Sequence, residues 1–198
     1  MGVVKLSQSG LRNYAKYSSM LAGNGAFSPS SYDLLTTTTL TSSAASVTFS
    51  GLGSYSGYKH LQIRYMMRLN SGFDGGTVQF RLNGDSANNY SYHQLIGGGA
   101  SVLSQAASNQ TMGQAGYGIG GNAPANVFGA GVLEILDFSA TSKNTTTRSL
   151  SGRVGAANSI LLTSSLWVNT AAVTSIELSP YFGDSMVTGS RFSLYGLK

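Results

Sequence analysis

Apolar and polar side chains alternate along most of this chain from Tyr32 onward. The clearest example is Lys59–Leu69, in which every second side chain is apolar and the residues between are mostly polar, with Met66 as the exception. Successive side chains of a β-strand point to opposite faces, so the alternation predicts a strand with one face in a hydrophobic core. The side chains expected to point inward here are Leu61, Ile63, Tyr65, Met67 and Leu69, and in the similar segment Thr77–Asn83 they are Val78, Phe80 and Leu82.

Further strands are predicted by the same period of two, interrupted by turn-forming residues. Asn83-Gly84-Asp85 is typical of a turn, after which Tyr90–Ile96 is expected to return as the next strand. Short strands at this spacing, with no helical period among them, are typical of an antiparallel sandwich or barrel. We therefore expect an all-β domain over residues 31–198. Its remaining expected strands are Leu34–Leu40, Ser46–Ser50, Val127–Phe138, Arg148–Val154, Ser159–Val168, Val173–Leu178 and Arg191–Leu197.

Two connections stand out in this pattern. Gly97–Ala125 is rich in Gly, Ser, Ala, Gln and Asn, with room for one or two short strands at most, and we expect a long loop there. A connection of this length in a compact domain is usually functional or ordered by a partner. The second connection, Gly51–Gly57, is shorter and carries Tyr55.

Residues 1–30 follow a different period. Within Leu11–Ala22, small and apolar residues recur at the i, i+3, i+4 spacing of a helix, and Gly23-Asn24-Gly25 is a plausible stop. So short a helix is marginal in water and orders only when packed on something. It is expected either to cover the domain's own sheet or to act as an arm that reaches a neighbouring subunit. The arm residues expected to contact a partner are Lys5, Leu11, Arg12, Tyr14, Lys16, Tyr17 and Leu21.

The composition is poor in charge. Asp, Glu, Lys and Arg make up 10% of the 198 residues, against about 25% in ordinary soluble domains, and there are 26 glycines. A core is nevertheless available, because 41% of the residues are hydrophobic and they include eleven Tyr and eight Phe. Free proteins normally rely on mixed surface charge for solubility and to protect sheet edges. So uncharged a surface suits a protein that is largely covered by neighbouring subunits.

The net charge of +5 raises the question of nucleic-acid binding. Lys5, Arg12 and Lys16 supply the bases of the first thirty residues, and the other bases are spaced singly with no Lys/Arg run. Nucleic-acid binding needs a basic patch or stripe, so we do not expect it. No stretch approaches about 18 apolar residues and no signal peptide is evident, so we expect no membrane span or export.

A search for catalytic or metal-binding residues gives no convincing set. The two histidines, His60 and His93, stand on expected strands and suit a polar sheet face. The nearest acidic pair, Glu134 and Asp137, would point to opposite faces of a strand, whereas paired catalytic carboxylates must converge. No zinc or calcium motif is present, and there is no cysteine. The glycine-rich run 116–121 lacks the strand–turn–helix context of a dinucleotide site. We expect no catalytic site, no cofactor and no metal.

Tyrosines near the expected loops offer another kind of site. Tyr55, Tyr90, Tyr92 and Tyr117 could stack on sugar rings, with Asn, Gln and Asp bonding the hydroxyls. Tyrosine is also an ordinary strand and interface residue. Glycan binding therefore stays open as an alternative to protein binding.

Several segments resemble a group of structural proteins of tailed bacteriophages, especially phages of aquatic bacteria and cyanobacteria. They include the opening Tyr32-Asp33-Leu34-Leu35, the stretch 83–93, the run 127–138, residues 148–152 and the ending Gly189-Ser190-Arg191-Phe192-Ser193-Leu194-Tyr195-Gly196-Leu197-Lys198. The likeness covers about residues 30–198, and its strongest element is the ending, a moderately specific motif. The resemblance implies a jelly-roll-like sandwich and a capsid-accessory or tail-fibre role, and it transfers no catalytic residues.

Two functions follow as expectations from composition and resemblance. The first is a capsid decoration or cement protein, assembled in the host cytoplasm into the virion and attached to other virion proteins through residues 1–30. The second is a tail-fibre or spike component that recognises a host surface glycan, with the Gly97–Ala125 loop or the nearby tyrosines as the contact. Both are non-enzymatic, and in both we expect a homo-oligomer within the particle.

Overall fold

The computed structural model describes residues 31–155 and 158–198, and the predicted arm with its seven contact residues lies outside them. The described residues form twelve strands and one 3-10 helix. The elements are β1 (Tyr32–Thr39), β2 (Val47–Ser50), η2 (Leu52–Tyr55), β3 (His60–Met67), β4 (Gly75–Leu82), β5 (Tyr90–Gly98), β6 (Ser101–Gln110), β7 (Gly113–Ile119), β8 (Gly129–Ile135), β9 (Thr145–Arg153), β10 (Ser159–Trp167), β11 (Ser175–Pro180) and β12 (Arg191–Leu197).

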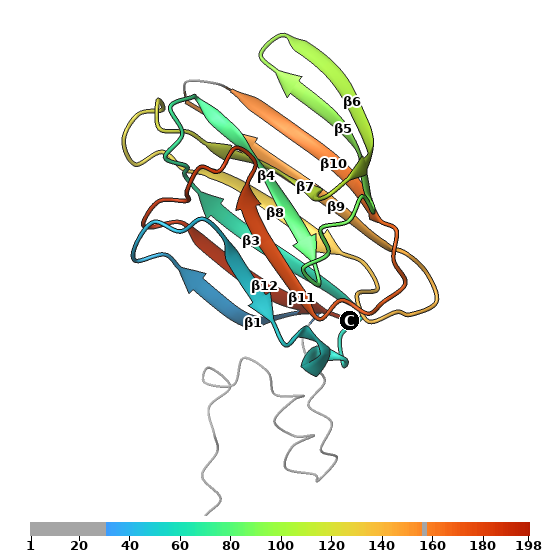
Figure 1. Cartoon of the computed structure of the whole chain (residues 1–198). Coiled ribbons are helices and arrows are strands. Elements are labelled where there is room, and N and C mark those ends of the chain that lie inside the picture. Colours follow the sequence, from blue (N-terminus) through green and yellow to red (C-terminus); the bar gives the residue numbers. More distant parts are fainter. Residues whose placement is uncertain (1–30, 156–157) are drawn as a thin grey trace, which may run out of the picture.

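The strands form two antiparallel sheets that pack as a sandwich (Figure 1). The larger sheet has eight strands in the order β1-β12-β3-β8-β9-β10-β5-β6, and the smaller has four in the order β2-β11-β4-β7. Many connections cross from one sheet to the other, so strands distant in sequence become neighbours. The predicted antiparallel β-sandwich is confirmed, and each of the ten expected strands overlaps an observed one. Among the described residues, no helix has the length and hydropathy needed to cross a bilayer.

The expected long loop over Gly97–Ala125 is wrong, because most of this segment is strand. β5 runs to Gly98 and turns through Gly99 and Ala100 into the ten residues of β6, and β7 follows after a short connection. Gly99 has a φ of +60°, which suits the first central position of a two-residue hairpin turn. The signal in the sequence was therefore a tight glycine turn, and only residues 120–128 form an extended loop before β8.

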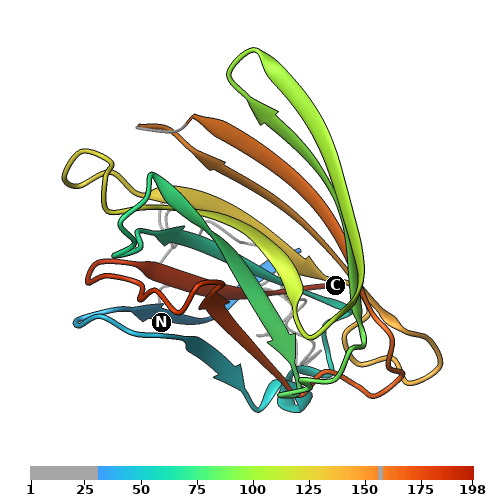
Figure 2. The same cartoon turned by 45° about the horizontal axis from the view of Figure 1, so that its top comes forward.

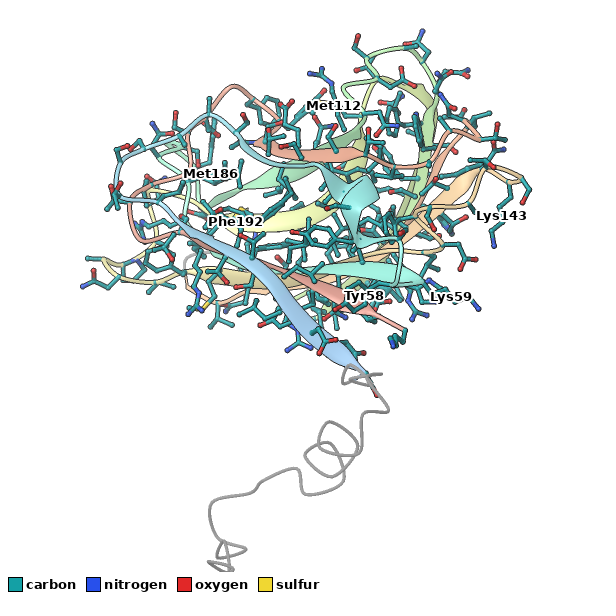
Figure 3. The ribbon with its side chains drawn as sticks, turned by 90° about the horizontal axis from the view of Figure 1, so that it is seen from below. Tyr58, Lys59, Met112, Lys143, Met186 and Phe192 are labelled. Atoms are coloured by element: carbon teal, nitrogen blue, oxygen red, sulfur yellow. The ribbon has the colours of Figure 1, made fainter. Side chains whose placement is uncertain are left out.

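The core lies between the sheets and is made of the inward-facing half of each strand. All eight side chains that alternation placed inside, from Leu61 to Leu82, are buried. Phe192 and Met186 are fully buried in the body of the domain, whereas Lys143 lies at its rim (Figure 3). Burying a large apolar side chain contributes roughly 1.5–3 kcal/mol. The alternating pattern thus provides the main stabilisation of the sandwich.

Strand β7 packs unusually close to the larger sheet. Beneath it, the inward residues of β9 and β10 are mostly Ser and Thr rather than large apolar residues. Two of these serines bond to the β7 backbone: Ser151 Oγ accepts the Tyr117 N–H at 3.0 Å and Ser165 Oγ accepts the Gln114 N–H at 3.3 Å. Side chains of the opposite sheet therefore satisfy backbone groups that β7, as an edge strand, would otherwise leave unpaired.

Arg68, just after β3, holds the loop that precedes β8. Its two terminal nitrogens donate to four backbone carbonyls, at 2.9 Å to Gly121, 2.7 Å to Ala123, 2.7 Å to Pro124 and 3.1 Å to Val127. A guanidinium presents its donors in a fixed planar fork, so one side chain can bond several acceptors together. This loop is ordered from within the chain.

Replacing Arg68 with alanine is expected to loosen the loop without unfolding the sandwich. Four charge-assisted hydrogen bonds are lost, and backbone amides near Gly121–Val127 should exchange with solvent about tenfold faster, which corresponds to roughly 1.4 kcal/mol. Hydrogen exchange measured by mass spectrometry checks this, with the exposed Arg191→Ala as the control. Unchanged exchange in this loop would show that the four bonds do not order it.

Candidate functional site: an apolar sheet face

The larger sheet has one face in the core and one face turned away from the smaller sheet. On this outer face, apolar residues from four adjacent strands lie directly opposite one another. Val132 of β8 pairs with Leu150 of β9, Leu150 with Leu162 of β10, and Leu162 with Leu95 of β5. The three leucines are between 44% and 52% exposed. They form a continuous apolar row across the sheet.

A second row runs beside the first. It joins Ala130, Gly152, Ile160, Gly97 and Val102 across β8, β9, β10, β5 and β6. Ile160 is 55% exposed and Val102 is 72% exposed. Ala130 and Gly152 have little or no side chain, so the surface between the rows is hollowed into an open groove of about 460 Å³. We call the two rows together the apolar outer face.

Polar residues border this face at one end. Opposite each other on β8 and β9, Glu134 and Arg148 form a salt bridge, and Gln62 donates a hydrogen bond of 2.9 Å to Glu134. Burial raises the pKa of Glu134, but hydrogen bonds from Arg148 and Gln62 outweigh it and bring that pKa below its ordinary value. Next to them, the Arg64 guanidinium lies 4.6 Å from the Tyr195 ring centre. The charges at this border thus have partners within the chain.

This arrangement has the chemistry of a protein-binding surface. Single exposed apolar residues are normal, but contiguous apolar patches bordered by polar residues mark interaction sites. The apolar outer face joins five strands, and its side chains stand in register because the ladder aligns them. A flat sheet surface of this kind can be covered by another sheet, a helix or an extended segment.

Of the two histidines, His60 lies next to an acid, Asp137. Asp137 lies beyond the end of β8, and its backbone N–H donates to His60 Nδ1 at 2.9 Å. His60 Nδ1 also lies 3.4 Å from the Asp137 carboxylate oxygen Oδ1. The Asp137 carboxylate also binds Lys143, which holds its pKa below the ordinary value. Across the described part of the chain, no three His, Cys, Asp or Glu side chains gather as metal ligands would.

Tyr90 is the clearest correction among the four tyrosines expected to contact a glycan. It is only 1% exposed, and its ring stacks on Trp167 with ring centres 6.4 Å apart. Its hydroxyl accepts the Leu82 N–H at 3.0 Å, and burial raises its pKa to about 12. Tyr90 is a core residue and is not available to a ligand.

The other three tyrosines are half-buried and lie on different elements. Tyr55 is in η2 and packs against the core, and Tyr92 is on the core-side face of β5, opposite Ser165. Tyr117 on β7 lies under the Arg153 guanidinium, 4.5 Å from its ring centre. The structure does not bring the four together into one sugar-binding surface.

The apolar outer face was not among the surfaces predicted from the sequence. The signal was present in Ser159–Trp167, where Ile160, Leu161 and Leu162 are consecutive, so that apolar residues occupy both faces of one strand. In Thr145–Arg153 the residues that point inward are Thr and Ser, whereas Leu150 points outward. Apolar residues on the solvent side of a strand are the mark of a covered sheet face.

Comparisons of the chain with protein-family models, with curated proteins and with solved structures found no match. Fold and site alone define the class: an antiparallel β-sandwich whose larger sheet presents an apolar outer face.

Proposed function

We propose that this protein is a non-enzymatic structural component of a bacteriophage particle, and that another virion protein subunit covers its apolar outer face. The observation that carries the proposal is the pair of apolar rows exposed in register across five strands. The resemblance of residues 30–198 to structural proteins of tailed phages supplies the setting. Within it, a capsid decoration protein fits best, because its surface would be extensively covered.

Residues 1–30 are the second attachment element in this proposal. They lead into β1, and the Tyr32 ring lies on the same outer side of the larger sheet, 5.4 Å from the Arg64 guanidinium. Because residues 1–30 join the domain on this side, they and the apolar outer face could bind the same partner protein. Two linked contacts bind more tightly than either alone, because the second forms at high effective concentration.

The apolar rows are large enough to contribute measurably. Completing the burial of a half-exposed leucine contributes about 1 kcal/mol, so several such residues offset part of the entropy cost of association. The tail-fibre alternative expected the Gly97–Ala125 loop or the nearby tyrosines to contact a sugar, but most of that segment is strand and the four tyrosines do not share one surface. Decoration is therefore the function that the geometry supports best.

A charged double variant of the apolar outer face tests this function. Leu150→Lys/Leu162→Lys should reduce binding to phage particles that lack this protein by about a hundredfold. The reason is that two ammonium groups would have to be desolvated at the contact. The fold should persist, because both sites are exposed and the repulsion between two lysines directly opposite each other costs only about 1 kcal/mol or less. Co-sedimentation with the particles measures the binding.

The matched control is Thr48→Lys/Ser50→Lys, which adds the same charge to exposed sites on β2 of the smaller sheet. It should bind like the unaltered chain. Equal binding by both double variants would exclude the apolar outer face as the contact. Counting copies per particle tests the role: decoration requires hundreds, and a count of tens or fewer would indicate a fibre.

A further inference from the structure

Strand β6 forms one edge of the larger sheet and is exposed along nearly all of its ten residues. The β5–β6 hairpin rises clear of the smaller sheet in two views of the molecule (Figures 1 and 2). An edge strand presents unpaired backbone N–H and C=O groups, so it is a template for another strand. Proteins usually protect such an edge.

The other edges of the two sheets carry protection, whereas β6 is irregular only at its C-terminal end, between Ala107 and Gln110. β2 is only four residues long, β1 contains Asp33 and an irregular register between Leu34 and Thr36, and side chains of the larger sheet bond to β7. β6 contains neither charge nor proline, and its register is regular from Ser101 to Ala107. The whole stretch from Ser86 to Leu133 holds no Asp, Glu, Lys or Arg.

The hairpin turn fixes which residues of β6 direct their backbone groups outward. Gly98 and Ser101 flank the two-residue turn and pair with each other, so their backbone groups face one another. Hydrogen-bonded and non-hydrogen-bonded pairs then alternate along an antiparallel ladder. Val102, Ser104 and Ala106 therefore turn their N–H and C=O groups away from β5, toward the free edge.

We propose that β6 pairs with β6 of a second copy of this chain, antiparallel, about a two-fold axis at Ser104. In this register Ser104 lies opposite Ser104 of the second copy and Val102 lies opposite Ala106, so the three outward-facing residues of each copy bond to those of the other. The larger sheets of two copies become one continuous sheet. A two-fold contact of this kind is closed and uses the same surface on both subunits.

The second copy is the occupant because the edge is complementary to itself. Small residues meet on the outer side, and on the inner side Leu103, which is 45% exposed, becomes a diagonal neighbour of its own counterpart. Two copies with a net charge of +5 repel each other, and the charge-free β5–β6 region lets their edges approach without a charge contact. Ser104 also pairs with Leu95, so the first apolar row of each copy would meet that of the other across the Ser104–Ser104 pair.

Single cysteines test this register cleanly, because the natural chain contains no cysteine. Directly opposed residues in a hydrogen-bonded pair lie about 5.5 Å apart between Cα atoms, within the range that a disulfide spans. On mild oxidation Ser104→Cys should form a covalent dimer. Val102→Cys and Ala106→Cys should each remain uncross-linked alone and cross-link when mixed. Failure of Ser104→Cys to cross-link, or cross-linking of Val102→Cys alone, would overturn the proposal.

Analytical ultracentrifugation of the full chain gives the second readout. The protein should dimerise, and Ser104→Lys should weaken dimerisation roughly tenfold, because it sets two like charges directly opposite each other. Thr36→Lys, on the exposed edge strand β1, is the matched control and should leave the dimer intact. Loss of assembly in both variants would indicate head-to-tail β1–β6 pairing and overturn the two-fold arrangement. A chain that is monomeric at every concentration would overturn it as well.

This inference does not rest on the proposed virion role. The Leu150→Lys/Leu162→Lys variant should still give the Ser104→Cys cross-link, since both leucines lie at least two strands from the β6 edge. If that variant loses particle binding and keeps the cross-link, the two surfaces act independently. If the cross-link fails while particle binding by the outer face persists, only the edge pairing is wrong.

Discussion

Trp167→Ala should destabilise the domain by about 4 kcal/mol, within the range of large aromatic truncations in protein cores. The side chain is 1% exposed at the end of β10 and stacks on Tyr90, which in turn meets the Phe80 ring edge-on at 6.1 Å between ring centres. Alanine would leave a cavity beside both rings. It would also remove the indole N–H that donates to Asp85 at 2.7 Å.

Asp85 makes the loss at Trp167 more than a packing defect. Hydrogen bonds from Asn89, from the Ala87 N–H and from Trp167 lower the pKa of this carboxyl, so the folded state stabilises its ionised form. One of these donors disappears with the indole. The tryptophan therefore ties the turn after β4 to β10 by a polar contact as well as by stacking.

Urea unfolding followed by circular dichroism measures the effect, because Trp167 is the chain's single tryptophan and its fluorescence is lost in the variant. Trp167→Phe is the control: it keeps an aromatic ring and loses the N–H, and we expect a cost of roughly 1–2 kcal/mol. If both variants unfolded at the urea concentration of the unaltered chain, the cluster would not be central to stability.

The strands that the sequence predicted are those whose two faces meet different surroundings. In β3, Leu61, Ile63 and Tyr65 are buried while Arg64 and Met66 are exposed, so the sandwich imposes the alternation that the sequence shows. Such strands can be found without knowing the partner sheet. Their ends were also predicted well, because glycine and asparagine turns interrupt the pattern.

The two missed strands lack this contrast. β6 is exposed on both faces, so neither face selects apolar residues. β7 is nearly all buried, but glycine and alanine occupy many of its positions because it lies against the larger sheet. Both sequences look like loops to any method that relies on period two. Only the place of each strand in its sheet explains why these residues form β6 and β7.

The apolar outer face was missed for a related reason. Alternation shows that a strand has two unlike faces, but it does not show which one points into the core. In β9, Ser149 and Ser151 point inward because β7 passes so close that larger side chains would not fit, and Leu150 points outward. The usual rule that apolar residues point inward would assign this strand the wrong way round.

Gly116→Ala tests that close approach, and we expect it to destabilise the domain by roughly 4 kcal/mol. Gly116 has a φ of +134°, a backbone conformation that costs a residue with a side chain about 1–3 kcal/mol. An added Cβ would also lie 2.4 Å from Ser151 Oγ and 2.6 Å from the Tyr65 hydroxyl oxygen. Relieving such overlap in a packed core costs a further 1–3 kcal/mol or so.

The Tyr65 contact makes the strain hard to relieve. Tyr65 is buried, and its hydroxyl donates to the Ala115 carbonyl at 3.0 Å, so moving the ring away from a new methyl group would break a buried hydrogen bond. Gly57→Ala is the control, because nothing lies within 4 Å of its added Cβ, and its unfolding midpoint should be unchanged. Gly116→Ala/Ser151→Gly should recover only part of the loss, since the Tyr65 overlap and the backbone conformation remain. A Gly116→Ala protein as stable as Gly57→Ala would mean that β7 does not sit this close to the larger sheet, and the inverted pattern of β9 would then need another cause.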